Sequence, residues 1–207
     1  MIRNPPTWFL LFELTTLFII FPLLYFFDLI PVHKIIPLVV LFVYCVIVLG
    51  LNKPINPDRF KTKANWKAIV VRFLSLNIVI FLWIKFFSSN ALFADFSVNK
   101  QLLLMTLIYP VSSAFPQELI FREFFFYRYE PLLNHKAVAI ICNMILFSFA
   151  HLYFANWTIL LFTFVGGLIF SLTYLNTKSL LVVTIEHSLF GILILSSGLA
   201  DQFYKAF

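Results

Sequence analysis

Charged residues are scarce in this sequence. They make up 12% of its 207 residues, while 62% of the residues are hydrophobic. A soluble globular protein carries roughly 25% charged residues, so this chain has too few polar groups to cover a surface that faces water. The apolar runs also lack the alternation of apolar and polar residues that strands of a membrane β-barrel show. Both absences favour an all-α membrane protein, because helices satisfy their own backbone hydrogen bonds in lipid.

Cysteine is rare, and the common hydrolase motifs are missing. The two cysteines, Cys45 and Cys142, lie in apolar runs, which favours buried thiols over a disulfide. The sequence holds no HExxH pair and no GxSxG motif, which argues against an ordinary zinc protease and against a serine hydrolase of that type. It also holds no internal repeat and no separate soluble region. Residues 1–207 are therefore expected to form a single membrane domain.

Long apolar runs are what the sequence has in abundance. A helix needs about 20 apolar residues to cross a bilayer. We expect a polytopic bundle of about seven to eight transmembrane helices, at residues 8–30, 35–51, 67–88, 101–130, 137–154, 157–175 and 179–198. The 101–130 run contains Pro110 and Pro116 and is longer than one straight span requires. It is therefore expected to be kinked or split.

The positive charges gather between the second and third expected spans. The net charge is +6, and this loop holds Lys53, Arg59, Lys61, Lys63 and Lys67. Cytoplasmic loops carry an excess of Lys and Arg, so we expect the loop and the N-terminus to be cytoplasmic. Nucleic-acid binding is another interpretation of a basic cluster. Because the loop is short and lies between two spans, we expect no nucleic-acid partner.

A few ionisable residues lie inside the apolar runs, namely Glu118, Arg122, His151, Glu186 and His187. Each is costly in a bilayer unless it is compensated, so such residues indicate a functional site. Glu118 and Arg122 are four residues apart, which places them on one helix face where they can form an ion pair. Glu186 and His187 are adjacent, so they cannot face each other on a helix.

Glu118, His151 and His187 lie on three different expected helices. A carboxylate with imidazoles can activate a water for hydrolysis, with or without a metal. These three side chains would make an adequate zinc ligand set with an open position, and metal-free activation of water by glutamate fits the same residues. Neighbouring Glu123 points about 100° round the helix. It is expected to have a structural role, paired with Arg128 or at the membrane interface.

Three short motifs follow one another in the second half of the chain. They are QELIFR at 117–122, FSFAH with Phe147 and His151, and TIEHSLFG with His187. Residues 101–195 thereby resemble the CPBP, or Abi, family of intramembrane peptidases, whose best-known members are the type II CAAX prenyl endopeptidases. The pattern of that family is EExxxR on one helix, FxxxH on the next, and a histidine followed four residues later by asparagine on the last.

The resemblance implies a CAAX-type intramembrane endopeptidase that hydrolyses a peptide bond of a membrane-associated peptide. By that pattern Glu118 and His151 would hold and activate the water, and His187 would stabilise the oxyanion. The supporting residues would be Gln117, Arg122, Glu186 and Phe147. The cofactor would be a divalent metal such as zinc, held by the three catalytic residues, or none. The partners would be a membrane-embedded or lipidated peptide and the lipid bilayer, in a bacterial cytoplasmic membrane.

Two positions depart from the family pattern. Gln117 stands where the family has its first glutamate, and an amide cannot accept a proton. Gly191 stands at the asparagine position and removes an oxyanion donor, a loss that can cost roughly 10²–10³ in rate. Both favour the alternative of a catalytically weakened family member that binds membrane partners, for instance in bacteriocin immunity. A small transporter or channel lined by the same buried ionisable residues is a third hypothesis.

Overall fold

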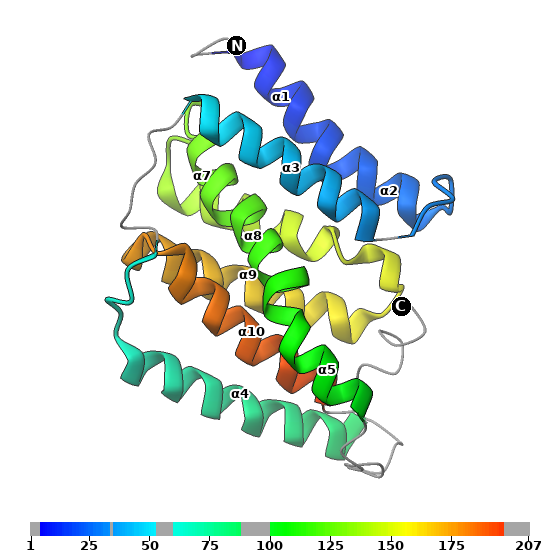
Figure 1. Cartoon of the computed structure of the whole chain (residues 1–207), viewed down its shortest axis with the longest axis vertical. Coiled ribbons are helices and arrows are strands. Elements are labelled where there is room, and N and C mark those ends of the chain that lie inside the picture. The colour runs from blue at the N-terminus through cyan, green and yellow to red at the C-terminus, as the bar shows by residue number, and fades with distance from the viewer. Residues whose placement is uncertain (1–4, 34, 53–59, 88–99, 197–207) are drawn as a thin grey trace.

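The protein is a bundle of helices (Figure 1). This computed structural model describes residues 5–33, 35–52, 60–87 and 100–196, and those ranges contain no β-strand. The all-α prediction is therefore confirmed. Cys45 and Cys142 are free thiols, as the sequence favours. The helices before residue 100 are α1 (Thr7–Thr15), which continues through the π-helical turn Thr16–Ile20 into α2 (Phe21–Phe26), then α3 (Ile35–Asn52) and α4 (Trp66–Phe87).

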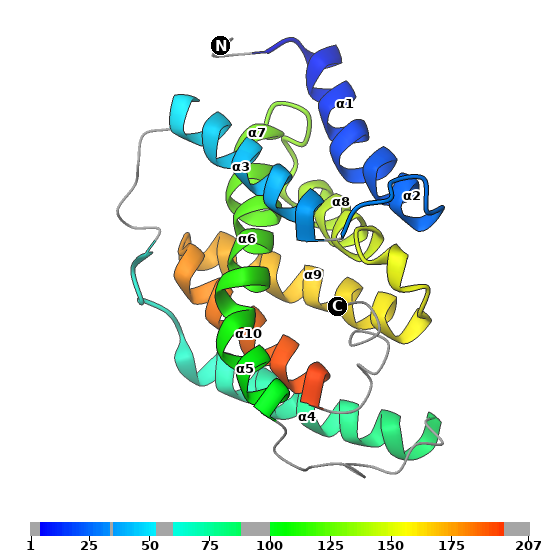
Figure 2. The same cartoon turned by 45° about the vertical axis from the view of Figure 1, so that its right-hand side comes forward.

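Residues 100–128 form one uninterrupted helix through the middle of the bundle (Figure 2). Its parts are α5 (Lys100–Tyr109), the π-helical turn Pro110–Ala114, α6 (Phe115–Glu118), the π-helical turn Leu119–Phe124 and α7 (Phe125–Arg128). The run is therefore not split. A proline lacks the backbone N–H and clashes with the carbonyl four residues earlier, and a wider π-helical turn accommodates it without ending the helix. All residues of the second π-helical turn are buried.

Three helices complete the bundle between α3 at one end and α4 at the other (Figure 1). They are α8 (Lys136–Phe149), which is followed by the short 3₁₀ turn Leu152–Phe154, α9 (Trp157–Thr177) and α10 (Leu180–Ser196). The side chain of Asn156 caps α9 by accepting two backbone N–H groups of its first turn. Lys178, with a left-handed φ of 53°, ends α9, and the chain turns into α10.

Several of the described helices are long and apolar enough to cross a membrane. They are Thr7–Phe26, Ile35–Asn52, Trp66–Trp83, Lys136–Phe154 and Trp157–Thr177. The other two predicted spans correspond to the central helix and to α10, which is a shorter apolar helix. Large apolar side chains face outward, for example Val40 and Leu74, which are 61% and 56% exposed. The prediction of a polytopic helical bundle is confirmed, and the protein is integral to the membrane.

A buried ion pair joins α1 to the end of the central helix. Nε of Arg128 lies 2.8 Å from Oε2 of Glu13, and the hydroxyl of Tyr44 on α3 donates to the same carboxylate. Glu123 is buried and accepts a hydrogen bond from the hydroxyl of Tyr174 on α9, at 2.7 Å. The expected pairing of Glu123 with Arg128 is thus corrected, because Arg128 lies against Glu13 instead. The contacts of Glu13 with Arg128 and Tyr44, and of Glu123 with Tyr174, connect α1, α3 and α9 to the central helix.

Candidate active site

A carboxylate and an imidazole meet in the middle of the bundle. Oε1 of Glu118 on α6 lies 2.7 Å from Nδ1 of His187 on α10, and Glu118 is fully buried. A carboxylate paired with a guanidinium accepts hydrogen bonds, so Nδ1 of His187 donates its hydrogen to Glu118. In the neutral imidazole the lone pair is then on Nε2. Glu118 therefore fixes both the orientation and the tautomer of His187.

Arg122 lies behind this pair and is also fully buried. Its Nε is 3.2 Å from Oε2 of Glu118, which confirms the ion pair expected from their spacing. Nη1 donates to Oδ1 of Asn143 on α8, at 2.6 Å, and Nδ2 of Asn143 donates to the backbone carbonyl of Phe121, at 2.6 Å. The hydroxyl of Ser171 on α9 also donates to Oδ1 of Asn143, at 2.9 Å. This network compensates a guanidinium that would otherwise be costly in an apolar interior.

Phe147 and Phe170 form the aromatic surroundings of His187. The ring of Phe170 on α9 stacks on His187 at a centroid distance of 4.7 Å and an angle of 16°. Phe147 on α8 meets the His187 ring edge-on at 5.7 Å, and the guanidinium of Arg122 lies 4.8 Å from the centre of the Phe147 ring. Phe147, the motif residue on α8, thus contacts the ion pair and both histidines, since the His151 ring is 4.9 Å away.

His151 lies just beyond the end of α8, where the helix unwinds. Its Nδ1 is 2.8 Å from the backbone carbonyl of Phe147. Because a carbonyl oxygen only accepts, Nδ1 donates and Nε2 of the neutral ring is left with a lone pair. His151 lines the cavity described below, so this site offers a proton acceptor held in one tautomer.

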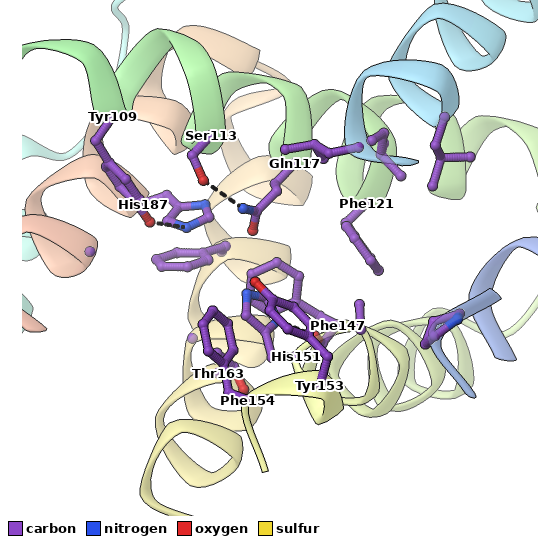
Figure 3. Close-up of a pocket in the computed structure, with 18 of the residues that line it drawn as sticks. Tyr109, Ser113, Gln117, Phe121, Phe147, His151, Tyr153, Phe154, Thr163 and His187 are labelled. Carbon is purple, nitrogen blue, oxygen red and sulfur yellow. Dashed lines mark hydrogen bonds between the residues drawn. The ribbon is translucent and has the colours of Figure 1, made fainter. Parts of the chain in front are cut away.

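Gln117 faces the same space from α6. Its Nε2 donates to the hydroxyl of Ser113, one turn earlier, at 2.9 Å. Its Oε1 is buried and has no hydrogen-bond partner among the described residues. Figure 3 shows the side chains of Gln117 and His151 directed toward one another across the cavity. A buried amide oxygen without a partner is costly, and a bound water or a substrate N–H would satisfy it.

These side chains line one cavity of about 670 Å³. Its polar lining is Tyr25, Tyr44, Tyr109, Ser112, Ser113, Gln117, His151, Tyr153, Thr163 and His187. Figure 3 labels several of them. The rest of the wall is apolar and comes mainly from α2, α3, α5, α9 and α10, with the π-helical turns Thr16–Ile20 and Leu119–Phe124. Glu118 does not belong to the lining, since it lies on the far side of His187. The arrangement brings His151, His187 and Gln117 together at one cavity and leaves Glu118 to hold His187 from behind.

Glu186 is bound elsewhere. Its Oε1 lies 2.6 Å from Nη2 of Arg72 on α4, and Arg72 also donates to the hydroxyl of Thr173, at 3.0 Å. Glu186 is fully buried and points away from its neighbour His187, as adjacent helical residues must. In the structure Glu118, and not Glu186, orients His187.

The zinc ligand set considered from the sequence does not form. Among the described residues, no group of three or more His, Cys, Asp or Glu side chains could hold a metal ion. The oxygens of Glu118 contact Arg122 and His187, and His151 lies on the other side of the cavity (Figure 3). The arrangement of these side chains therefore does not fit a zinc site.

The sequence reasoning missed Tyr109 and Asn143. The hydroxyl of Tyr109 lies 3.1 Å from Nε2 of His187, and Asn143 holds Arg122. One signal for Tyr109 was present, because Tyr109, Ser113 and Gln117 are spaced at intervals of four and share a helix face. Asn143 offered only a lone amide in an apolar run.

The fold and the buried polar site define a helical membrane protein with two histidines at an internal cavity. Residues 99–193 match the family model described as type II CAAX prenyl endopeptidase Rce1-like. The match confirms the family resemblance for this segment, which includes all the motif residues named above. Comparison with curated proteins and with solved structures found no match.

Proposed function

We propose that the protein is an intramembrane endopeptidase that uses water to hydrolyse a peptide bond of a membrane-associated peptide. The observation that carries this proposal is the pair of histidines at one cavity, with the Nε2 lone pair of His151 facing a space that His187 also lines. The match to a family of CAAX-type proteases supports it. By the positive-inside rule we also propose that the basic loop after α3, of which residues 53–59 lie outside the described part of the chain, faces the cytoplasm.

His151 is the proposed general base. Its Nδ1–H is held by the carbonyl of Phe147, so Nε2 takes a proton from the attacking water. Oε1 of Gln117 accepts the other hydrogen of that water and orients it, although an amide cannot remove a proton. The water oxygen bonds to the peptide carbon, and the C–N bond then breaks as His151 passes its proton to the leaving amine.

His187 stabilises the oxyanion that forms during this attack. In this proposal His187 enters the step protonated on both nitrogens and keeps both protons. Nδ1–H donates to Glu118, whose negative charge stabilises the imidazolium, and Nε2–H faces the cavity. The prediction that Glu118 itself activates the water stays a prediction. The geometry favours Glu118 as the residue that positions His187, because Glu118 contacts His187 and Arg122 and does not line the cavity.

The cavity wall indicates the kind of substrate. Apart from the polar groups named above, the wall consists of apolar side chains from helices that face lipid. An extended, apolar peptide segment would bury its side chains there while its scissile carbonyl reaches the histidines. The proposed partner is therefore a membrane-embedded or lipidated peptide.

The test is cleavage of pooled internally quenched peptides by the purified chain in phospholipid vesicles. Replacing His151 with Gln should lower the rate by about 10²–10⁴-fold, the range for loss of a general base. His135→Gln, on an exposed turn, is the matched control and should leave the rate unchanged. Full activity in the His151→Gln variant would show that the proposed mechanism is wrong.

A second function, a non-catalytic membrane binding or immunity protein, is favoured by Gln117 and Gly191. The two functions predict different outcomes for Gln117→Glu in the same vesicle assay. An active native chain should become faster, because a carboxylate beside the water adds a second base. A native chain without cleavage that gains it in Gln117→Glu would identify a weakened descendant, and the endopeptidase proposal would fail for the natural sequence.

A further inference from the structure

Gly191 has no room for a side chain unless Tyr109 moves. A Cβ built at this position would collide with the hydroxyl and ring of Tyr109. Gly191 follows His187 by four residues, so both lie on the same face of α10. The space that a side chain at position 191 would take beside His187 is thus filled by Tyr109, which reaches it from α5.

The hydroxyl of Tyr109 lies at the reactive face of His187. Its oxygen is 3.1 Å from Nε2, and both residues line the cavity (Figure 3). Tyr109 is the last residue of α5, immediately before the π-helical turn Pro110–Ala114. Ser113 and Gln117 follow it on the same helix face and also line the cavity.

We propose that the hydroxyl of Tyr109 is a catalytic oxyanion donor, which takes the place of a donor at position 191. The inference rests on the proposed endopeptidase function. A phenol carries one hydrogen and two acceptor lone pairs. It can accept a hydrogen bond from protonated Nε2 of His187 and donate its own hydrogen to the carbonyl oxygen of the substrate. No covalent bond forms or breaks at Tyr109.

With Tyr109 as donor, glycine at position 191 does not leave the site without an oxyanion donor. From the sequence, Gly191 counts as a lost donor. In the structure, glycine is the residue that lets Tyr109 enter, and the donor comes from another helix. Tyr109 and a side chain at 191 exclude each other sterically, so the two positions are expected to behave as a coupled pair.

The first experiment replaces Tyr109 with Phe, which removes the hydroxyl and keeps the ring. With the fastest-cleaved peptide of the quenched pool in vesicles, kcat should fall by about 10²–10³-fold, with KM changed less than about threefold. Tyr127→Phe is the matched control, since Tyr127 does not line the cavity and its hydroxyl bonds the carbonyl of Asn52. It should keep the native kcat.

The second experiment exchanges the donor. Tyr109→Ala alone should lose the same activity as Tyr109→Phe and leave space beside Gly191. Adding Gly191→Asn to Tyr109→Ala should recover at least about tenfold of kcat, because the amide supplies a donor in the vacated space. Gly191→Asn in the native background should be inactive or misfolded, since the new side chain meets Tyr109.

The outcomes separate this proposal from the proposed function. All variants are measured in the native and in the Gln117→Glu backgrounds. Absence of cleavage in both backgrounds overturns the endopeptidase function and this inference with it. Cleavage that is equal or faster in Tyr109→Phe overturns only this inference, and a faster rate shows that Tyr109 obstructs His187. A loss in Tyr109→Phe with recovery in the exchanged pair establishes the donor.

Discussion

The carboxylate of Glu118 lies 2.7 Å from Nδ1 of His187 and 3.2 Å from Nε of Arg122. One buried carboxylate therefore serves a neighbour on its own helix and a partner on α10. The contact with Arg122 compensates its charge, and the contact with His187 sets which imidazole nitrogen faces the cavity. Glu118 is therefore expected to affect both the stability of the bundle and the chemistry of the site.

Glu118→Gln tests the effect of Glu118 on catalysis and its effect on stability. The amide cannot stabilise a protonated His187, so kcat should fall by about 10²–10⁴-fold, comparable to the loss in a catalytic triad that lacks its carboxylate. Arg122 would be left as a buried charge, so unfolding free energy should drop by about 3–5 kcal/mol. Activity is measured in vesicles, and stability by denaturant unfolding in detergent micelles. Glu130→Gln, on an exposed turn, is the control. A native unfolding midpoint in Glu118→Gln would contradict the ion pair.

Asn143 is predicted to be a stabilising residue of the core. Asn143→Ala removes the acceptor of Arg122 Nη1 and the donor to the carbonyl of Phe121. Each of the two groups left unsatisfied costs roughly 1–3 kcal/mol, so the unfolding free energy should drop by about 2–6 kcal/mol in the same measurement. Asn176→Ala, exposed near the end of α9, should change stability little. Equal effects of the two substitutions would argue against the network.

The close packing of α8 and α9 is tested by a pair of glycines. A Cβ at Gly167 would lie 2.8 Å from Cα of Met144, whereas a Cβ at Gly50 meets nothing within 4 Å. Gly167→Ala should therefore destabilise the protein by about 1–3 kcal/mol, as overpacking does, since the contact is with backbone. Gly50→Ala should be neutral or slightly stabilising, because alanine favours helix more than glycine does. An unchanged free energy of unfolding in Gly167→Ala would mean that α8 and α9 can move apart without loss of stability.

The contact between α4 and α10 depends on Arg72 and Glu186. Arg72→Gln leaves the buried carboxylate of Glu186 without its cation. The free energy of unfolding, measured by denaturant unfolding in detergent micelles, should drop by about 1–3 kcal/mol. This lies below the usual cost of breaking a buried pair, because the Arg72 side chain is 38% exposed. Adding Glu186→Gln should recover part of that stability, since it removes the unpaired buried carboxylate. Simple addition of the two losses would show that the side chains act independently.

The fold was largely predictable from the sequence. In lipid each helix must satisfy its own backbone hydrogen bonds, so apolar runs of sufficient length mark the spans directly. Over the described residues, the predicted runs correspond to helices within a few residues, apart from the part of run 101–130 that forms a turn after Arg128. Residues 88, 197 and 198 of the predicted runs lie outside the described part of the chain. The local ion pair of Glu118 with Arg122 was also predictable, because a spacing of four fixes two residues on one helix face.

The partners across helices were not predictable. Arg72 and Glu186 are 114 residues apart, and Tyr109 and His187 are 78 apart. Hydropathy gives the length of a helix but not its rotation about its axis, which is set by packing against neighbours. Glu123 shows the consequence, since its buried contact with Tyr174 replaces the local pair expected for it.

The sequence by itself determined that this is a helical membrane protein and which ionisable residues lie within it, because the cost of burying charge makes such residues conspicuous in apolar runs. Only the tertiary structure decided that Glu118 holds His187, that His151 and Gln117 face the cavity, and that Tyr109 fills the space beside Gly191. Those relationships depend on how helices rotate and approach one another. The rotation and approach of the helices depend on how all the packed side chains fit together, and not on the hydropathy pattern along any one helix.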